Sequence, residues 1–366
     1  MRTSEFDYDL PPERIAQEPV EPRDTSRLMV VDRASGEIVH RRFYDLPSFL
    51  DPGDLLVHNQ TKVIRARLFA VKPTGGKVEI LLLRERDEGP GRGLSSKEAR
   101  TWETLVGGRR VRPGMTLTLL DGPDGRAIDA QAEVIEQGER AMRVLRFDQP
   151  VLPLAEEIGV TPLPPYIHET LEDDERYQTV YARQPGSAAA PTAGLHFTPD
   201  LLHELRDLGV RSAFVTLHIG LDTFQPMREE RIEEHEMHSE RCLLRPEVAR
   251  QINQTKLEGK RVVAVGTTSV RVLETAALRA VGDDAGAETC PRQTVAAFEG
   301  ETDLFIYPGY DFRAVDALVT NFHLPRSTLL MLVAAFAGKP LIERAYAEAV
   351  DRDYRFYSFG DAMLIL

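Results

Sequence analysis

The stretch "VVAVGTTSVR", residues 262–271, decides the fold class. Its apolar run 262–265 predicts a buried strand, and a glycine and three hydroxyl residues, Thr267, Thr268 and Ser269, follow at once. A hydroxyl can cap a helix there, so the stretch predicts a strand that leads directly into a helix. The free N–H groups of such a helix start attract a carboxylate or phosphate, although a plain cap without a ligand explains the same residues. The spacing matches neither the P-loop nor the G-x-G-x-x-G pattern.

Strands and helices alternate around this stretch. Alternation of this kind predicts βαβ units and a mainly parallel sheet with helices on both faces. In such sheets ligands bind beyond the carboxyl ends of the strands. The expected strands are residues 211–217, 262–265, 304–307 and 317–320, after a hairpin of 26–32 and 37–43, and the expected helices are 199–208, 246–258, 269–279, 328–337 and 341–350.

Residues 62–150 have a different pattern, with short strand-like runs and glycine-bearing turns but no convincing helix. This pattern predicts a six-stranded β-barrel or sandwich, inserted into an α/β layered domain made of residues 1–61 and 151–366. Residues 85–100 read as a long, mobile loop within it. The expected strands are residues 63–68, 78–83, 101–106, 115–120, 130–135 and 142–147.

The net charge also differs between residues 62–150 and the rest of the chain. The 366 residues carry a net charge of −13, but residues 62–150 alone are net +4 and the remainder is net −17. A basic module on an acidic body indicates a polyanionic partner, although a solvated basic face explains the charge equally well. The densest basic segment is "GGRRVRPG" (107–114), which holds Arg109, Arg110 and Arg112, and Arg65 and Arg67 lie elsewhere in the module.

Several classes of protein are excluded by composition. Cys242 and Cys290 are too far apart in sequence for a metal motif and too few for a disulfide framework, which fits a reducing cytoplasm. The N-terminus has no apolar core of a signal peptide, and the longest apolar run, 327–338, is too short to span a membrane. In "HEMHSE" (235–240) the two histidines are three residues apart rather than four, so we expect no zinc site.

Histidines with polar neighbours are the candidates for chemistry. They stand at the starts or ends of expected elements, in "HNQT" (58–61), "GSAAAPTAGLHFT" (186–198), "HIGLDTF" (218–224) and "NFHLPRST" (321–328). The small residues of 186–198 would let the backbone approach a bulky ligand closely, although tight loop packing explains them as well. The C-terminal segment 351–366 reads as a docking strand or helix, with Asp361 as its one functional candidate.

Taken together, these segments resemble one family, the queuosine-biosynthesis S-adenosylmethionine:tRNA ribosyltransferase-isomerases. The resemblance covers essentially the whole chain and includes "DYDLPPERIAQEP" (7–19), "DLLVHNQTKV" (54–63), "TDLFIYPGYDF" (302–312) and "YRFYSFGDAMLI" (354–365). One departure is Asp222, where glycine is more usual. The resemblance implies an α/β/α sandwich with an inserted six-stranded antiparallel β-barrel and an active centre where they meet.

The resemblance also implies the reaction. The ribosyl part of S-adenosylmethionine is transferred and isomerised onto 7-aminomethyl-7-deazaguanine at the tRNA wobble position, which gives epoxyqueuosine, adenine and methionine. S-adenosylmethionine is thus a consumed substrate, and we expect no cofactor, no metal and no membrane partner. The family further implies a monomer. The sulfonium acidifies the ribose C5′ hydrogens, so the chemistry needs a base, an acid for adenine and an anion site for the methionine carboxylate.

These requirements lead to residue hypotheses. We assign His196 or His218 to proton transfer, with Glu236 and His238 nearby. Thr267, Thr268 and Ser269 would hold an anionic group at the helix start. The remaining substrate contacts would come from His58, Asn59, Ser187, Thr192, Asn321 and His323, and tRNA phosphates would contact Arg65, Arg67, Arg109, Arg110 and Arg112.

Two other functions fit parts of the sequence. A methyltransferase would use the same S-adenosylmethionine but needs a glycine-rich loop after its first strand, and none is apparent. A noncatalytic tRNA-binding protein would leave the polar clusters at the strand ends without a purpose.

Overall fold

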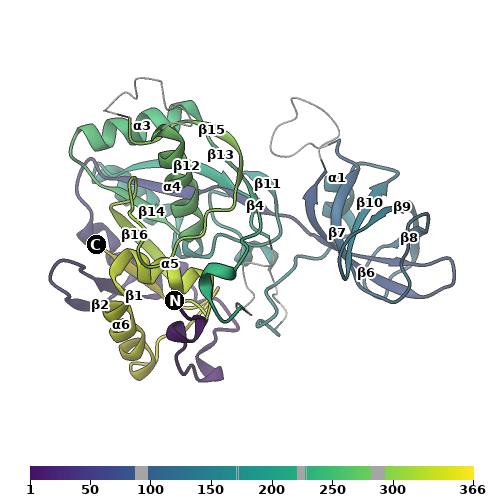
Figure 1. Ribbon diagram of the computed structural model, residues 1–366, viewed down its shortest axis with the longest axis horizontal. Helices are drawn as coiled ribbons and strands as arrows, with labels where there is room; N and C mark the ends of the chain where they lie inside the picture. Colours follow the sequence, from purple (N-terminus) through teal and green to yellow (C-terminus); the bar gives the residue numbers. More distant parts are fainter. Residues whose placement is uncertain (87–97, 170, 172, 221–226, 228, 282–292) are drawn as a thin grey trace.

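The computed structural model describes residues 1–86, 98–169, 171, 173–220, 227, 229–281 and 293–366. The chain forms a body around a nine-stranded sheet and a closed six-stranded barrel beside it (Figure 1). Among the described residues, no helix combines the length and the apolar character needed to cross a membrane.

The sheet of the body is mixed rather than mainly parallel. Its three central pairs, β12–β3, β3–β14 and β14–β16, are parallel, whereas both ends contain antiparallel pairs. The antiparallel strands arise because the edges are built from a hairpin and from the two outer strands next to β12, not from βαβ units. In spatial order the strands are β15 (Phe298–Thr302), β13 (Glu240–Leu244), β12 (Arg211–Leu217), β3 (Leu55–Asn59), β14 (Val262–Val265), β16 (Ala317–Asn321), β17 (Ala362–Ile365), β1 (Arg27–Val31) and β2 (Ile38–Arg42).

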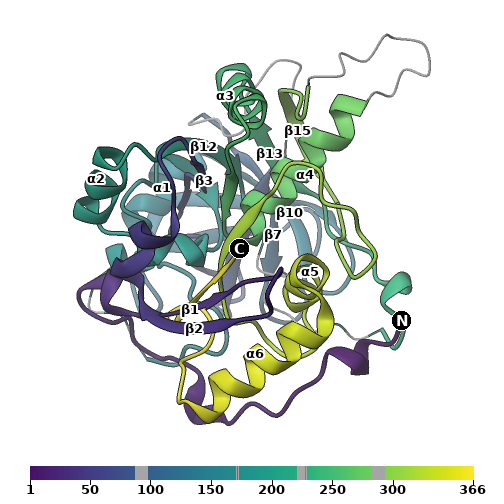
Figure 2. The ribbon, with the colours of Figure 1, turned by 90° about the vertical axis from the view of Figure 1, so that its left-hand side faces the viewer.

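Both faces of this sheet are buried. Side chains alternate along each strand, so Val262 and Ala264 enter one core cluster while Val263 and Val265 enter another. Figure 2, viewed from the body side, shows α5 and α6 packed together beside β1 and β2. One face is covered by α3 (Pro246–Leu257), α4 (Thr267–Val281), α5 (Thr328–Ala337) and α6 (Lys339–Asp351), the other by α2 (Pro199–Asp207) and the short helices η4 (Phe43–Phe49) and η6 (Thr192–His196).

The barrel is antiparallel at all six strand pairs and contains the fully buried Trp102. Its core cluster reaches from Ile64 to Ile158, because α1 (Val151–Ile158) packs its apolar face onto the barrel. The domain boundaries at 61/62 and 150/151 stay predictions. In closing order the strands are β10 (Met142–Phe147), β7 (Thr101–Val106), β6 (Lys77–Glu85), β5 (Arg67–Val71), β8 (Thr116–Leu120) and β9 (Ala127–Gln137).

The predicted fold class is confirmed, but several elements differ from expectation. Residues 304–307 form no strand; the edge strand lies earlier, at β15, because β13 offers its free edge to residues 298–302. The predicted strand 63–68 is divided between β4 (Thr61–Val63), which pairs with β11 (Gln184–Ser187), and the first barrel strand β5. The predicted loop 85–100 lies mostly outside the described residues.

The C-terminal segment docks as strand β17, parallel to β1. The Asp361 carboxylate accepts hydrogen bonds from the backbone N–H groups of Arg27 and Arg355, both at 2.8 Å. Asp361 therefore tethers this segment to the body.

Candidate active site

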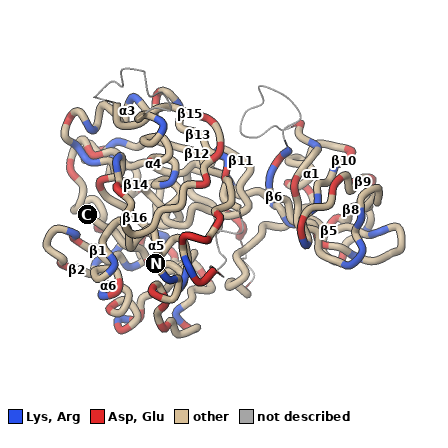
Figure 3. Tube along the Cα trace, viewed as in Figure 1, with Lys and Arg blue, Asp and Glu red and all other residues tan. Residues whose placement is uncertain are grey.

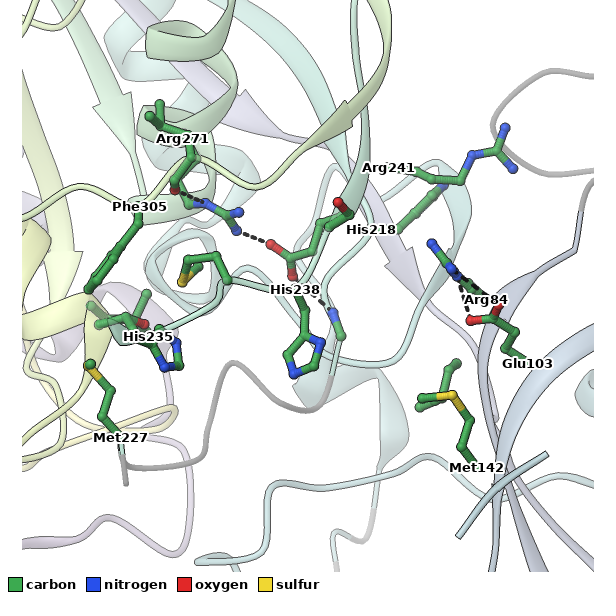
Figure 4. A pocket seen from close by; sticks show the side chains of 18 of the residues that line it. Arg84, Glu103, Met142, His218, Met227, His235, His238, Arg241, Arg271 and Phe305 are labelled. Atoms are coloured by element: carbon green, nitrogen blue, oxygen red, sulfur yellow. Dashed lines mark hydrogen bonds and ion pairs between the residues drawn. The ribbon is translucent and has the colours of Figure 1, made fainter. Parts of the chain in front are cut away.

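A cavity of about 510 Å³ lies where the barrel meets the body. Figure 4 shows Arg271 and Phe305 on the body side and Arg84 and Glu103 on the facing barrel side. The cavity collects side chains from segments far apart in the sequence: Arg84, Trp102, Glu103 and Met142 from the barrel, and His218, His235, His238, Glu240, Arg241, Arg271 and Phe305 from the body.

His218 follows the carboxyl end of β12 and lines this cavity. Its Nδ1 atom lies 2.8 Å from the Thr61 hydroxyl, which can in turn donate to the Gln184 carbonyl at 3.5 Å. When the Thr61 hydroxyl donates to Gln184, it accepts the Nδ1 proton of His218, and this tautomer leaves a lone pair on Nε2. Nε2 is shielded from solvent and has no hydrogen-bond partner among the described residues. Burial lowers the pKa of His218 to about 4, and the nearby positive charge of Arg241 adds to the effect, so the ring is neutral at pH 7.

Gly186 packs against the His218 ring. Its φ of +138° is a backbone conformation that favours glycine, and a Cβ placed there would lie 2.9 Å from His218 Cε1 and 3.0 Å from Nε2. The absence of a side chain at Gly186 thus allows the His218 ring to pack directly against the backbone.

Glu240 and Arg271 form a buried ion pair in the cavity wall. Arg271 also donates from Nε to the Leu304 carbonyl and from Nη2 to the Thr302 carbonyl, both at 3.1 Å. Glu240 Oε1 accepts from the Gly220 N–H at 3.1 Å. The pair is held by backbone groups on both sides, so its charges occupy defined positions at the cavity.

Arg84 joins the barrel to the body across the cavity rim. Its guanidinium donates to Glu103 on the neighbouring barrel strand at 2.6 and 3.1 Å and to Glu301 of the body at 3.2 Å. Arg84 and Glu301 are both about half exposed, with side-chain exposures of 45% and 48%. Solvent screens this contact, which positions the two parts more than it stabilises them.

The "HEMHSE" segment crosses the cavity without forming a metal centre. His235 pairs with Glu229 at 3.0 Å and packs edge-on against Phe305. His238 is exposed and lines the cavity, whereas the exposed Glu236 does not line it. Across the described ranges, no group of three or more histidine, cysteine, aspartate and glutamate side chains is placed to hold a metal ion.

Two small cavities, each of about 30 Å³, adjoin the large one at the shared residue Leu329. Thr192, Asn321 and His323 line both of them. Asn321 donates from Nδ2 to the Tyr357 carbonyl at 2.9 Å, while its Oδ1 has no partner among the described residues. His323 Nε2 lies 2.7 Å from the Thr320 hydroxyl, and burial lowers the His323 pKa to about 3. An unsatisfied buried acceptor such as Asn321 Oδ1 is a contact available to a donor.

The start of α4 uses its hydroxyls in a different way from the one expected. Ser269 donates back to the Val265 carbonyl at 2.8 Å, and Thr268 accepts from Asn59 Nδ2 at 3.2 Å. Neither bond caps the helix. Thr267 and Thr268 line one of the small cavities, whereas Ser269 is fully buried and structural.

Besides Ser269, four of the predicted site residues belong to the packed core and line none of these three cavities. His58 lies among the rings of Tyr181, Phe197 and Phe214, and burial lowers its pKa to about 3. Their side chains form hydrogen bonds within the core or fill space in it, because strands β3 and β11 and helix η6 direct them inward. The four residues are His58, Asn59, Ser187 and His196.

His196 is enclosed on every side that its ring could use. Nδ1 lies 2.7 Å from the Ser26 hydroxyl, Nε2 lies 3.3 Å from Asn321 Nδ2, and the ring stacks on Phe43. Burial chiefly lowers its pKa to about 3. Of the two histidines assigned to proton transfer, only His218 reaches the cavity.

The predicted RNA-binding arginines lie away from the cavity. Arg65 and Arg67 form ion pairs with Asp174 and Glu79 at 3.4 and 3.1 Å. Arg109, Arg110 and Arg112 are exposed on the connection between β7 and β8. Figure 3 shows acidic and basic residues interspersed over both parts of the molecule, so the difference in net charge is not a division into two faces.

Sequence reasoning missed Glu240, Arg271 and Arg84. A signal for Glu240 exists, since Glu240, Cys242 and Leu244 alternate on the buried face of β13. Arg271 stands within the run 267–277, in which every residue of α4 is buried, so an arginine there requires a partner. Nothing in the sequence marks Arg84, whose role depends on the packing of the barrel against the body.

The chain thus belongs to a class of proteins in which an α/β body carries an inserted antiparallel barrel. A polar cavity lies between the two parts. The sequence pattern of the family described as "Queuosine biosynthesis protein" matches residues 3–365. The chain belongs to this family.

Individual relatives span the whole chain. It is 55% identical over 364 residues to the S-adenosylmethionine:tRNA ribosyltransferase-isomerase of Thermus thermophilus, covering 99% of this chain and 98% of that one. The protein of the same name from Symbiobacterium thermophilum is 54% identical over 368 residues, covering 100% of both. A crystal structure of the S-adenosylmethionine tRNA ribosyltransferase from Thermotoga maritima aligns with a TM-score of 0.54 at 44% identity, covering 99% of this chain and 100% of that one.

Proposed function

We propose that this chain is an S-adenosylmethionine:tRNA ribosyltransferase-isomerase. It transfers and isomerises the ribosyl moiety of S-adenosylmethionine onto 7-aminomethyl-7-deazaguanine at the tRNA wobble position, giving epoxyqueuosine-tRNA, adenine and methionine. Family membership over residues 3–365 and full-length relatives of that name support the proposal. The observation that carries it is the cavity between barrel and body, which holds a neutral histidine with a free ring nitrogen.

We propose His218 as the base that removes a ribose C5′ proton. A base needs an available lone pair at neutral pH, and the lowered pKa of His218, at about 4, keeps Nε2 unprotonated. In this proposal the Thr61 hydroxyl, 2.8 Å from Nδ1, accepts its proton and so favours the tautomer with a free Nε2. The sulfonium stabilises the carbanion that results, so a weak base suffices, and the RNA phosphates would raise the His218 pKa once bound.

The other substrate groups match the remaining polar contacts. The Asn321 carbonyl oxygen, free of partners among the described residues, suits a ribose hydroxyl, with Thr192 and His323 beside it. The start of α4 at Thr267 and Thr268 suits the methionine carboxylate, because helix N–H groups favour an anion. S-adenosylmethionine acts here as a consumed substrate, and the proposal includes no cofactor.

The tRNA would lie across barrel and body, with phosphate contacts from the exposed arginines Arg109, Arg110 and Arg112. We further propose a monomer that works in the cytoplasm, where tRNA is modified and where two distant cysteines fit the reducing conditions.

Incubation of the protein with S-adenosylmethionine and precursor-containing tRNA tests the proposal. We expect stoichiometric release of adenine and methionine and a tRNA mass increased by the ribosyl-derived group. A tRNA gaining only the mass of a methyl group would identify a methyltransferase instead. Tight tRNA binding with no adenine released would identify a noncatalytic binding protein.

A further inference from the structure

A second polar hollow, of about 340 Å³, lies on the body outside the active-site cavity. Its lining differs from that of the cavity, since it combines two arginines with amide side chains and one aromatic ring. The residues that matter here are Gln60, Arg183, Gln184, Phe214, Arg245 and Gln251.

The hollow and the cavity share the short strand β11. Gln184 of β11 lines the hollow, and Gly186, two residues further along the strand, lines the cavity beside His218. Two residues of an extended strand span about 7 Å. Gln60 likewise lines the hollow and directly precedes Thr61, the partner of His218. A polymer with one residue in the cavity can therefore place its neighbour in the hollow.

The charges of the hollow favour an anion. Arg183 and Arg245 are exposed, and neither forms an ion pair within the part of the chain that the structure describes. Glu247 is the one carboxylate among the residues of this lining. Two guanidinium groups against one carboxylate leave a net positive site that suits a phosphate.

The ring of Phe214 adds a surface for stacking. One side of the ring is stacked on His58, with centroids 5.5 Å apart, and the Arg183 guanidinium lies 5.6 Å from the ring centroid. Phe214 is only half-buried, so part of its surface and the planar guanidinium above it remain open to a ligand. Unpaired RNA bases stack on aromatic rings and on arginine planes in this way.

We infer that this hollow is a subsite for an unpaired nucleotide of the tRNA that adjoins the nucleotide being modified. Its base contacts Arg183 and Phe214, and its phosphate contacts Arg245. The inference rests on the proposed function, which places the wobble nucleotide in the neighbouring cavity. It assigns the body, in addition to the exposed arginines of the barrel, a direct share in holding the RNA.

Charge reversal tests the phosphate contact. We measure the Kd of an anticodon stem–loop RNA, carrying 7-aminomethyl-7-deazaguanine, for Arg183→Glu, Arg245→Glu and the control Arg250→Glu. Arg250 is an exposed arginine of α3 that does not line the hollow. We expect Arg245→Glu to weaken binding about tenfold and to reduce the slope of log K against log salt by about 0.7, the value for one single-strand phosphate contact. Arg250→Glu should bind the RNA and release adenine like the wild type.

An abasic nucleotide tests the stacking contact. Two RNAs are compared, each abasic at one of the two nucleotides that flank the wobble position. We expect wild-type affinity to fall about tenfold for one of them, the RNA that lacks the stacking base. Arg183→Lys keeps the charge but removes the planar group. Loss of the base should therefore reduce the RNA affinity of this variant much less than it reduces that of the wild type. The salt slope of Arg183→Lys should remain that of the wild type.

The outcomes separate this inference from the proposed function. If wild-type protein releases adenine but Arg183→Glu and Arg245→Glu bind RNA like Arg250→Glu, or neither abasic RNA couples to Arg183→Lys, the subsite is wrong and the function stands. If wild-type protein releases no adenine, the proposed function is wrong and the subsite with it.

Discussion

Two histidines that lie near opposite ends of the segment 186–198 have different environments. His218 packs against Gly186 at one end and keeps a free Nε2 in the cavity wall. His196 stands near the other end with both ring nitrogens engaged and its ring stacked on Phe43. Burial holds both rings neutral, with pKa values lowered to about 4 and about 3. Neutrality is therefore common to both rings. They differ because His218 lines the cavity and its Nε2 has no partner among the described residues, which is why we propose His218 as the base.

The largest expected difference is in turnover. His218→Gln should lower adenine release about a thousandfold with little loss of stability, because it removes the proton acceptor. His196→Gln should leave turnover per folded molecule near wild type but lower the free energy of unfolding by about 2 kcal/mol, because it breaks buried hydrogen bonds. Single-turnover adenine release and chemical denaturation of both variants provide the measurement. Equal losses of turnover in the two variants would abolish the distinction.

Adding one methyl group beside His218 tests its position. Gly186→Ala should lower turnover about a hundredfold, because its Cβ would contact Cε1 at 2.9 Å and displace the ring. Gly309→Ala is the control: it has the same kind of positive φ, at +105°, but no atom within 4 Å of the new Cβ. If both variants lose activity to the same extent, backbone strain rather than contact with the ring explains the loss.

Acid should destabilise the fold through the core histidines. The pKa of His58 is lowered from its ordinary value to about 3, so below about pH 6.5 the unfolded chain binds a proton that the folded chain does not. Stability is therefore lost as the pH falls, by about 2 kcal/mol per such histidine near pH 5. His58→Phe keeps an aromatic ring and should remove the contribution of His58 to this loss of unfolding free energy. Urea unfolding at about pH 5 and pH 8 measures the difference. A wild-type pH dependence that persists in this variant would contradict the assignment.

The smallest expected effect concerns the partner of His218. Thr61→Val preserves shape but removes the hydroxyl that faces Nδ1, so the ring spends part of its time in the tautomer without a free Nε2. We expect turnover to fall about fivefold, the worth of one ordinary hydrogen bond. Thr216→Val, at a buried threonine of the nine-stranded sheet, is the control. Unchanged turnover would show that other contacts set the tautomer.

The fold was largely predictable because its signals are local. The strands 211–217 and 262–265 and the helix 328–337 agree with prediction to the residue, since apolar runs and capping residues mark their ends. The edge strand β15 was not predicted, because "FEGET" (298–302) has no strong strand pattern and forms by pairing with β13. Edge strands depend on a partner, which sequence periodicity does not show.

The site was predictable only in part. Asn321, His323 and His218 do line cavities, as the polar ends of strands indicated. The same reasoning selected His58 and Asn59, whose side chains face the core instead. Strand ends have two faces, and the sequence of a strand buried on both faces does not tell which one adjoins a cavity. Asp222, which departs from the family pattern, lies outside the described residues.

By itself the sequence determined the α/β body, the inserted barrel, the difference in net charge and membership of the family, because each depends on local patterns or on motif order. Tertiary structure alone decided which of the two histidines, His196 or His218, lines the cavity. The Thr61 hydroxyl next to His218 Nδ1 is 157 positions away in the sequence. At the cavity rim, Arg84 of the barrel donates to Glu301 of the body. Contacts over such distances arise from packing, which brings chosen side chains together and encloses others whose local sequence looks equally suited to chemistry.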